Sequence, residues 1–178
     1  MIAAHVTRAK FGLIAFCLAG LMGGHVSAGE LPKESVLPLA LATKAAHATV
    51  DQCLADGYQV SVTVVDRGGN IRAVLRQDGA GSHTVESSRK KAYTSASLKQ
   101  PTAKLAELVA KMPAVQGLQH MNDHILLLGG GLPIVIGDDV VGGIGVGGAP
   151  GGHLDAACAQ AGLTSIGATT RVEKPAKR

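Results

Sequence analysis

Two histidines separated by three residues, His120 and His124, have the spacing in this chain that best suits metal chemistry. On an α-helix this spacing puts both imidazoles on one face, as zinc and iron sites require. The residues around them have no helical pattern and lead directly into a predicted strand, and no third ligand follows at a recognisable spacing. The spacing alone is therefore weak evidence for a metal centre.

A second group of polar residues lies on a predicted helix over residues 84–99, which we expect Thr84 with Glu86 to cap. His83 stands at the start of this helix, and Arg89, Lys90 and Lys91 form a basic cluster within it. One or two of these cations can hold a ligand carboxylate, and the alternative is a solvated basic face. The chain contains no nucleophile elbow, metalloprotease motif or P-loop, so it carries no strong catalytic signature.

A glycine-rich stretch over residues 129–152 contains GIGVGG at residues 143–148, which matches the GxGxxG string of dinucleotide-binding loops. That loop also requires an acidic residue about 20 positions later and further strand–helix units. Only 30 residues follow Gly148, and no acidic residue stands at the required distance. We therefore expect these glycines to allow tight hairpins and close backbone approach.

The two ends of the chain differ from its body. Residues 1–28 combine Arg8 and Lys10, an apolar run over residues 11–24 and a small-residue cleavage site at Ala28, which is typical of a signal peptide. We expect a periplasmic or secreted protein that does not span a membrane. Residues 29–170 form one predicted domain, and residues 171–178 a basic, disordered tail.

The composition of the predicted mature chain excludes one class of function. Without Arg8 and Lys10 the chain keeps 15 basic and 13 acidic residues, so its body is almost neutral. Its aromatic residues are then only Tyr58 and Tyr93. Nucleic-acid binding needs a basic face or stacking aromatics, so we do not expect a nucleic-acid partner.

Two cysteines of the predicted mature chain, Cys53 and Cys158, lie on predicted helices far apart in the sequence. In an oxidising compartment we expect them to form a disulfide, which in the chain-entropy model contributes up to about 4–5 kcal/mol. The alternative is a pair of buried free thiols.

The hydrophobic pattern predicts the element order αββααβββα in a single α+β domain. Because tight turns join neighbouring strands, the strands must be antiparallel. The predicted helices cover residues 38–56, 84–99, 101–112 and 154–161, and the five predicted strands cover residues 59–66, 71–77, 125–128, 133–136 and 140–146.

Three segments together resemble the GlcG/HbpS-type haem-binding family, which is related to the C-terminal domain of PduO-type cobalamin adenosyltransferases. They are VVDRGGNIRAVLRQDGAG at residues 64–81, RKKAYTSAS at residues 89–97 with Pro101-Thr102, and the stretch over residues 129–162. The resemblance implies a five-stranded antiparallel sheet flanked by helices, a homo-oligomer, and non-covalent binding of haem b or another tetrapyrrole. In some members it also implies slow haem degradation, or sensing through a membrane-anchored partner or transporter.

The resemblance also implies candidate haem contacts. Thr102 stands at a position tied to haem contact in one branch of the family, although a threonine there is also a good helix N-cap. Better iron ligands are His83, His120, His124 and Tyr93, while Arg89 and Lys91 suit the propionates. The alternatives are an accessory protein or enzyme for a small carboxylic acid of glycolate type, and a structural or signalling partner without a ligand.

Overall fold

The computed structural model describes residues 33–171 of the chain. The predicted signal peptide and almost all of the predicted basic tail lie outside the described residues. Within residues 33–171, no helix combines the length and the apolar character needed to cross a membrane.

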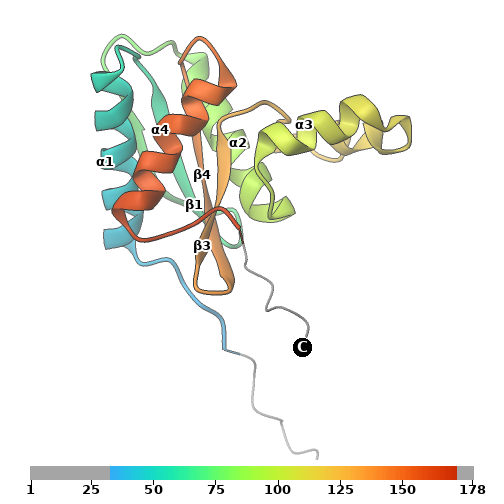
Figure 1. Ribbon diagram of the computed structural model, residues 1–178, viewed down its shortest axis with the longest axis horizontal. Helices are drawn as coiled ribbons and strands as arrows, with labels where there is room; N and C mark the ends of the chain where they lie inside the picture. Colours follow the sequence, from blue (N-terminus) through green and yellow to red (C-terminus); the bar gives the residue numbers. More distant parts are fainter. Residues whose placement is uncertain (1–32, 172–178) are drawn as a thin grey trace, which may run out of the picture. The chain divides into compact units, whose positions relative to one another are not determined.

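The described residues form an α+β fold around one antiparallel sheet with the strand order β2-β1-β4-β3 (Figure 1). Both predicted hairpins, β1–β2 and β3–β4, are confirmed. In chain order the elements are α1 (Leu39–Ala55), β1 (Ser61–Asp66), β2 (Ile71–Arg76), α2 (His83–Leu98), α3 (Thr102–Lys111), the 3₁₀-helix η1 (Pro113–His120), β3 (Gly131–Ile136), β4 (Asp139–Gly147) and α4 (Gly152–Ser165).

The sheet has four strands, so the prediction of a fifth strand over residues 125–128 was wrong. These residues form a loop that packs on α2 and α3. The Leu126 N–H donates to Thr94 Oγ1 at 2.9 Å, and the Leu128 carbonyl accepts from Thr102 Oγ1 at 2.7 Å. Helix side chains thus satisfy backbone groups that a neighbouring strand would otherwise pair.

One face of the sheet is apolar and is covered by α1 and α4 (Figure 1). The alternation of β1 and β4 places Val62, Val64, Ile144 and Val146 on this face, all fully buried. The predicted disulfide is formed: it joins Cys53 of α1 to Cys158 of α4, with the two Cα atoms 5.4 Å apart. The apolar face and the disulfide together form the main core.

The last helix is longer than predicted and does not end at Gly162. A Cβ at Gly162 would lie only 2.0 Å from Thr49 Oγ1 of α1. This glycine therefore lets α4 lie directly against α1 instead of ending the helix.

The opposite face of the sheet carries α2 at very short range. Cβ atoms at Gly143 and Gly145 would lie 2.3 and 2.1 Å from the carbonyl oxygens of Ala92 and Ser88. The predicted role of these glycines in close backbone approach is confirmed, because GIGVGG forms most of an antiparallel strand under a helix.

The contact between α2 and the sheet combines a small apolar cluster of Val65, Ala92 and Ala96 with pairs of hydroxyl groups. Thr84 Oγ1 lies 2.7 Å from Ser61 Oγ, and Thr63 Oγ1 lies 2.8 Å from Ser88 Oγ. The prediction that Thr84 caps α2 was wrong, since Thr84 is a buried residue of the helix and Ser82 holds the N-cap position. These pairs fix α2 in register on β1.

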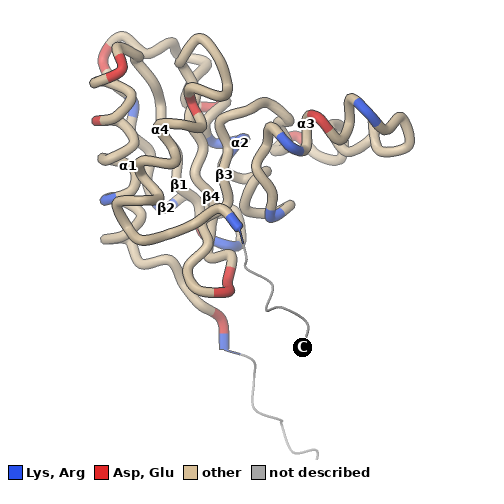
Figure 2. The backbone as a smooth tube through the Cα atoms, in the orientation of Figure 1, with Lys and Arg blue, Asp and Glu red and all other residues tan. Residues whose placement is uncertain are grey.

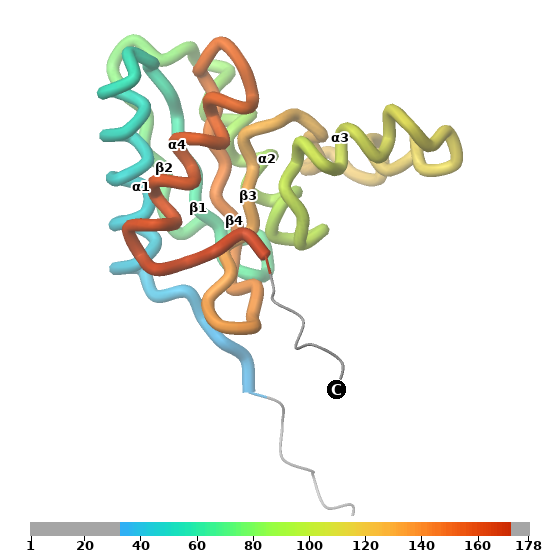
Figure 3. The backbone as a smooth tube through the Cα atoms, in the orientation of Figure 1, coloured from blue at the N-terminus to red at the C-terminus, as the bar shows by residue number. Residues whose placement is uncertain are grey.

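Beyond α2, the chain continues through α3 and η1 and returns along residues 122–128 to β3, as Figure 3 traces. Figure 2 shows that Lys and Arg are interspersed with Asp and Glu along the described backbone, including both signs on α3. The segment of residues 122–128 brings distant polar residues back onto α2.

Candidate functional site

A cluster of four side chains lies on the outer face of α2. Arg89 and Tyr93 are one helical turn apart and share this face, and His124 reaches them from the segment of residues 122–128. Arg89 Nη2 lies 3.2 Å from His124 Nδ1, and the rings of Tyr93 and His124 lie 5.2 Å apart at 57°. With Glu86, which binds Arg89, we call this group the α2–His124 cluster.

Glu86 and Arg89 form a bidentate ion pair within the cluster. Arg89 donates from Nε to Oε2 at 2.9 Å and from Nη2 to Oε1 at 2.6 Å. The hydrogen bonds from Arg89 lower the pKa of the Glu86 carboxyl, and the same contact raises the pKa of Arg89. Both groups therefore stay charged, and the Arg89 side chain remains 23% exposed to solvent and to anions.

The position of His124 depends on its neighbours along the chain. The backbone N–H of His124 donates to Asn122 Oδ1 at 2.8 Å, and the next residue, Ile125, is buried. The bond from Leu126 to Thr94 then fixes this stretch on α2. The His124 imidazole is thereby exposed but held in place.

The ring of Tyr93 packs against the imidazole of His124. A Cβ at Gly69 in the β1–β2 turn would lie 2.6 Å from Tyr93 Cδ2, so the ring lies directly over this turn. Gly69 has φ +82°, a conformation that favours glycine in any case. Tyr93 thus packs between the turn and His124, where its ring can hold the imidazole in place.

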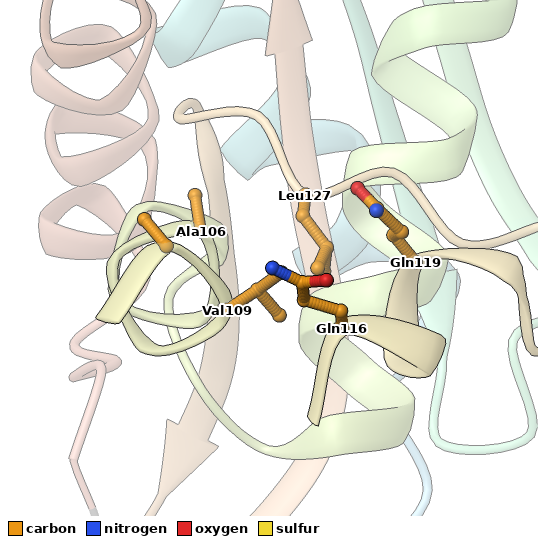
Figure 4. Close-up of a pocket in the computed structure, with 6 residues that line it drawn as sticks. Ala106, Val109, Gln116, Gln119 and Leu127 are labelled. Atoms are coloured by element: carbon orange, nitrogen blue, oxygen red, sulfur yellow. The ribbon is translucent and has the colours of Figure 1, made fainter. Parts of the chain in front are cut away.

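A groove of about 370 Å³ opens between α3, η1 and the returning segment (Figure 4). In Figure 4, the amide of Gln116 reaches between Val109 and Leu127, while Gln119 approaches from η1. We call it the α3–η1 groove; its lining residues are Ala106, Val109, Ala110, Gln116, Gln119 and Leu127. The lining combines four apolar side chains with two amides that can form hydrogen bonds, and more of its accessible surface is polar than apolar.

Lys91 faces away from this cluster, although it is only two residues from Arg89. Its ammonium is buried and contacts Asp155 Oδ2 and the Val146 carbonyl, each at 2.8 Å. Burial raises the pKa of Asp155, although the Lys91 ammonium and the Ala149 N–H favour the ionised form. The structure thus corrects the assignment of Lys91 to a ligand carboxylate, and Arg89 and Lys90 are the members of the basic cluster left to meet a small acid.

Thr102 is also committed to the fold. Pro101 occupies the N-cap position of α3, so the expectation of an N-cap threonine was wrong. The Thr102 hydroxyl donates to the Leu128 carbonyl and accepts from the Gly131 N–H at 2.9 Å. An iron atom bound to this buried hydroxyl would have to replace bonds that join α3 to β3.

The other histidines lie elsewhere. His83 is exposed at the start of α2, in a separate hollow of about 280 Å³ that Tyr58 and Gly148 help to line, and ten residues of helix separate it from Tyr93. His120 is exposed at the end of η1. Among residues 33–171, no group of three or more His, Cys, Asp and Glu side chains could hold a metal ion, so a protein-only metal centre at His120 and His124 is not supported.

Sequence reasoning missed the role of Glu86, which it treated as part of a helix cap. The available signal was the spacing of Glu86 and Arg89, which places them on one face of the helix. It also missed Gln116 and Gln119, because the 3₁₀-helix that carries them has no periodic signature.

Comparison with known proteins identifies the family. Residues 37–164 match the family described as haem degrading protein HbpS-like. A curated but uncharacterised 15.0 kDa protein of Citrobacter freundii is 36% identical over 115 residues, covering 64% of this chain and 81% of that protein.

Two solved structures are also similar. A double mutant of HbpS from Streptomyces reticuli matches with TM-score 0.72 and 39% identity, covering 88% of this chain and 97% of that one. The PduOC:heme complex matches with TM-score 0.70 and 25% identity, covering 76% of this chain and 99% of that one. With its fold, its α2 motif and its glycine-rich β4 all within the matched region, this chain belongs to the HbpS-like family.

Proposed function

We propose that this protein binds haem b non-covalently at the surface formed by the α2–His124 cluster and the α3–η1 groove. The observation that carries the proposal is an exposed imidazole, His124, that is fixed beside Arg89 and stands three positions before Leu127 of the α3–η1 groove in the sequence. Membership of the HbpS-like family and similarity to a protein solved with haem support the same ligand.

The residues of this surface suit the three chemical parts of haem. His124 offers an imidazole to iron, Arg89 offers a cation to a propionate, and Val109 and Leu127 offer apolar surface to the porphyrin. Tyr93 would orient His124 through ring packing. Once bound, haem itself would supply one-electron and oxygen chemistry.

The groove is shallow, and residues 33–171 contain two tyrosines and neither phenylalanine nor tryptophan to enclose a porphyrin. We propose that a second copy of the chain covers the remaining face, which makes the haem-binding form a homo-oligomer. The predicted signal peptide supports a periplasmic or secreted location. There the protein would store or sense haem, or degrade it slowly, alongside a membrane-anchored sensor or transporter.

Hemin titration with absorbance in the Soret region tests this proposal. Wild-type protein should show a saturable Soret shift, and His124→Ala should weaken binding at least about tenfold through loss of an iron ligand. His83→Ala is the matched control, because it removes an exposed histidine of α2 that lines a separate hollow.

Three results would contradict the proposal in different ways. The absence of a saturable Soret shift in wild-type protein would exclude haem as the ligand. Weakening by His83→Ala and not by His124→Ala would move the site to the start of α2. Weakening by His120→Ala alone would move the iron ligand to the end of η1.

A further inference from the structure

We propose that Glu86 and Arg89 control which nitrogen of His124 is free to bind a metal, and that a ligand carboxylate releases this control. The inference rests on the proposed haem site and adds a condition for its use. In the free protein His124 is held in a tautomer that cannot coordinate iron through Nε2. A ligand that brings its own carboxylate to Arg89 removes the restraint.

The hydrogen bond between Arg89 and His124 can run in only one direction. The guanidinium of arginine has only donors, so Arg89 Nη2 must donate to His124 Nδ1 across the 3.2 Å that separates them. A neutral imidazole has one donor nitrogen and one acceptor nitrogen. When Nδ1 accepts from Arg89, the ring proton is therefore on Nε2.

This arrangement leaves both nitrogens unsuited to iron. A protonated Nε2 has no lone pair to donate, and the lone pair of Nδ1 is already directed at Arg89. His124 can coordinate through Nε2 only after the contact with Arg89 is broken. The proton then leaves Nε2 and another is taken up at Nδ1 through water, so the charge of the ring does not change.

Glu86 keeps Arg89 in this position. Its two oxygens engage Nε and Nη2 of the guanidinium at 2.9 and 2.6 Å, and Nη2 is the same nitrogen that contacts His124. The raised pKa of Arg89 and the lowered pKa of Glu86 agree with a pair that stays ionised. On the other side, the Tyr93 ring limits the movement of the imidazole.

The pair is open to competition, because the Glu86 side chain is 55% exposed and that of Arg89 is 23% exposed. Exposed ion pairs of this kind contribute little to stability, so an incoming carboxylate can replace Glu86 at modest cost. A haem propionate is such a carboxylate. Glu86 and Arg89 are thus positioning residues that favour iron porphyrins with free carboxylates over those without.

The first measurement needs no haem. Two-bond ¹H–¹⁵N spectra of the histidine rings of the full protein at about pH 8 report the tautomer of each ring. His124, assigned by its loss in His124→Ala, should be solely the Nε2–H form in wild-type protein. Arg89→Leu should give a mixture of both tautomers, with Glu86→Gln intermediate.

The matched control is Glu107→Gln, which removes a carboxylate from a similar exposed ion pair with Lys111 on α3, away from His124. It should leave the His124 signals unchanged. A wild-type His124 that is mainly the Nδ1–H form would overturn the inference, whether or not the protein binds haem.

The second measurement compares hemin with hemin dimethyl ester, which lacks free carboxylates. If the restraint leaves the coordinating form about one-tenth populated, Arg89→Leu should strengthen binding of the ester up to about tenfold. The same substitution should weaken binding of hemin itself. Unchanged or weaker ester binding by Arg89→Leu would contradict the inference, while failure of wild-type protein to bind either compound would contradict the proposed function instead.

Discussion

The ammonium Nζ of Lys91 lies 2.8 Å from Asp155 Oδ2, and both side chains are almost completely buried, at 2% and 4% exposure. The same ammonium bonds the Val146 carbonyl, so one side chain of α2 contacts both β4 and α4. A Cβ at Gly130 would lie 2.6 Å from Asp155 Cβ and 3.0 Å from Lys91 Nζ, which shows how closely the chain surrounds this pair. The pair is a structural link between three elements and is separate from the α2–His124 cluster.

Removing one partner of this link should strongly destabilise the fold. Lys91→Met leaves the Asp155 carboxylate buried without its cation, and we expect a loss of about 3–5 kcal/mol in the free energy of unfolding. The double variant Lys91→Met with Asp155→Asn should recover part of this loss, because the amide carries no charge to bury. Urea denaturation measures both, and a double variant that is less stable than the single one would contradict the ion-pair account.

The hydroxyl of Thr102 should order the segment of residues 122–128 through its bonds to Leu128 and Gly131. Thr102→Val leaves the part-buried Leu128 carbonyl and the buried Gly131 N–H without their partner, which should cost about 1–3 kcal/mol. Hydrogen exchange at Gly131 should become faster. The control is Thr164→Val, whose exposed hydroxyl bonds only within α4; equal effects of the two substitutions would argue against a specific role for Thr102.

Gly145 should not tolerate even a methyl group. Gly145→Ala places a Cβ 2.1 Å from the Ser88 carbonyl and 2.5 Å from the Ala92 nitrogen, so α2 would have to move off the sheet. We expect a loss of about 3 kcal/mol or more by thermal or urea denaturation. Gly117→Ala in η1, where a Cβ meets nothing within 4 Å, should leave stability almost unchanged.

Glu86 should make a pH-dependent contribution to stability. Its pKa is lower in the folded protein than the ordinary value of 4.5, because the folded state binds Arg89 through the ionised carboxyl. The contribution is therefore present above pH 4.5 and is lost as the pH falls through the lowered pKa.

The free energy of unfolding of wild-type protein minus that of Glu86→Gln isolates this contribution. We expect a small positive difference at pH 7 that shrinks below pH 4.5. A difference that grows on acidification would contradict the ion pair with Arg89.

Local sequence signals predicted most of the fold. The alternation of Val60, Val62 and Val64 against Ser61 and Thr63 identified β1, and it also distinguishes the apolar face from the face under α2. The fifth strand was wrongly predicted because an apolar run such as ILLL carries no information about its hydrogen-bond partners. Here these partners are Thr94 and Thr102, which are far away in the sequence.

Sequence reasoning named Arg89, Tyr93 and His124 as candidates, but it predicted neither the part of Glu86 nor the way these side chains come together. His124 stands 35 residues after Arg89, and no spacing rule joins them; their contact depends on how α3 and η1 turn the chain back. The separation of Arg89 from Lys91 was accessible, because residues two apart on a helix point to nearly opposite sides. Read as a helix, RKKAY already places Arg89 and Lys91 on nearly opposite sides.

The disulfide between Cys53 and Cys158 closes a covalent ring of the chain that includes the whole sheet, α2, α3 and η1. Any single cut by a protease within that ring, including one in α3, η1 or residues 122–128, would leave two fragments that remain joined. Nicked protein should therefore migrate as an intact chain on a non-reducing gel and separate into two bands only after reduction. Oxidised protein can thus lose the continuity of its chain at α3, η1 or residues 122–128 while both fragments stay together.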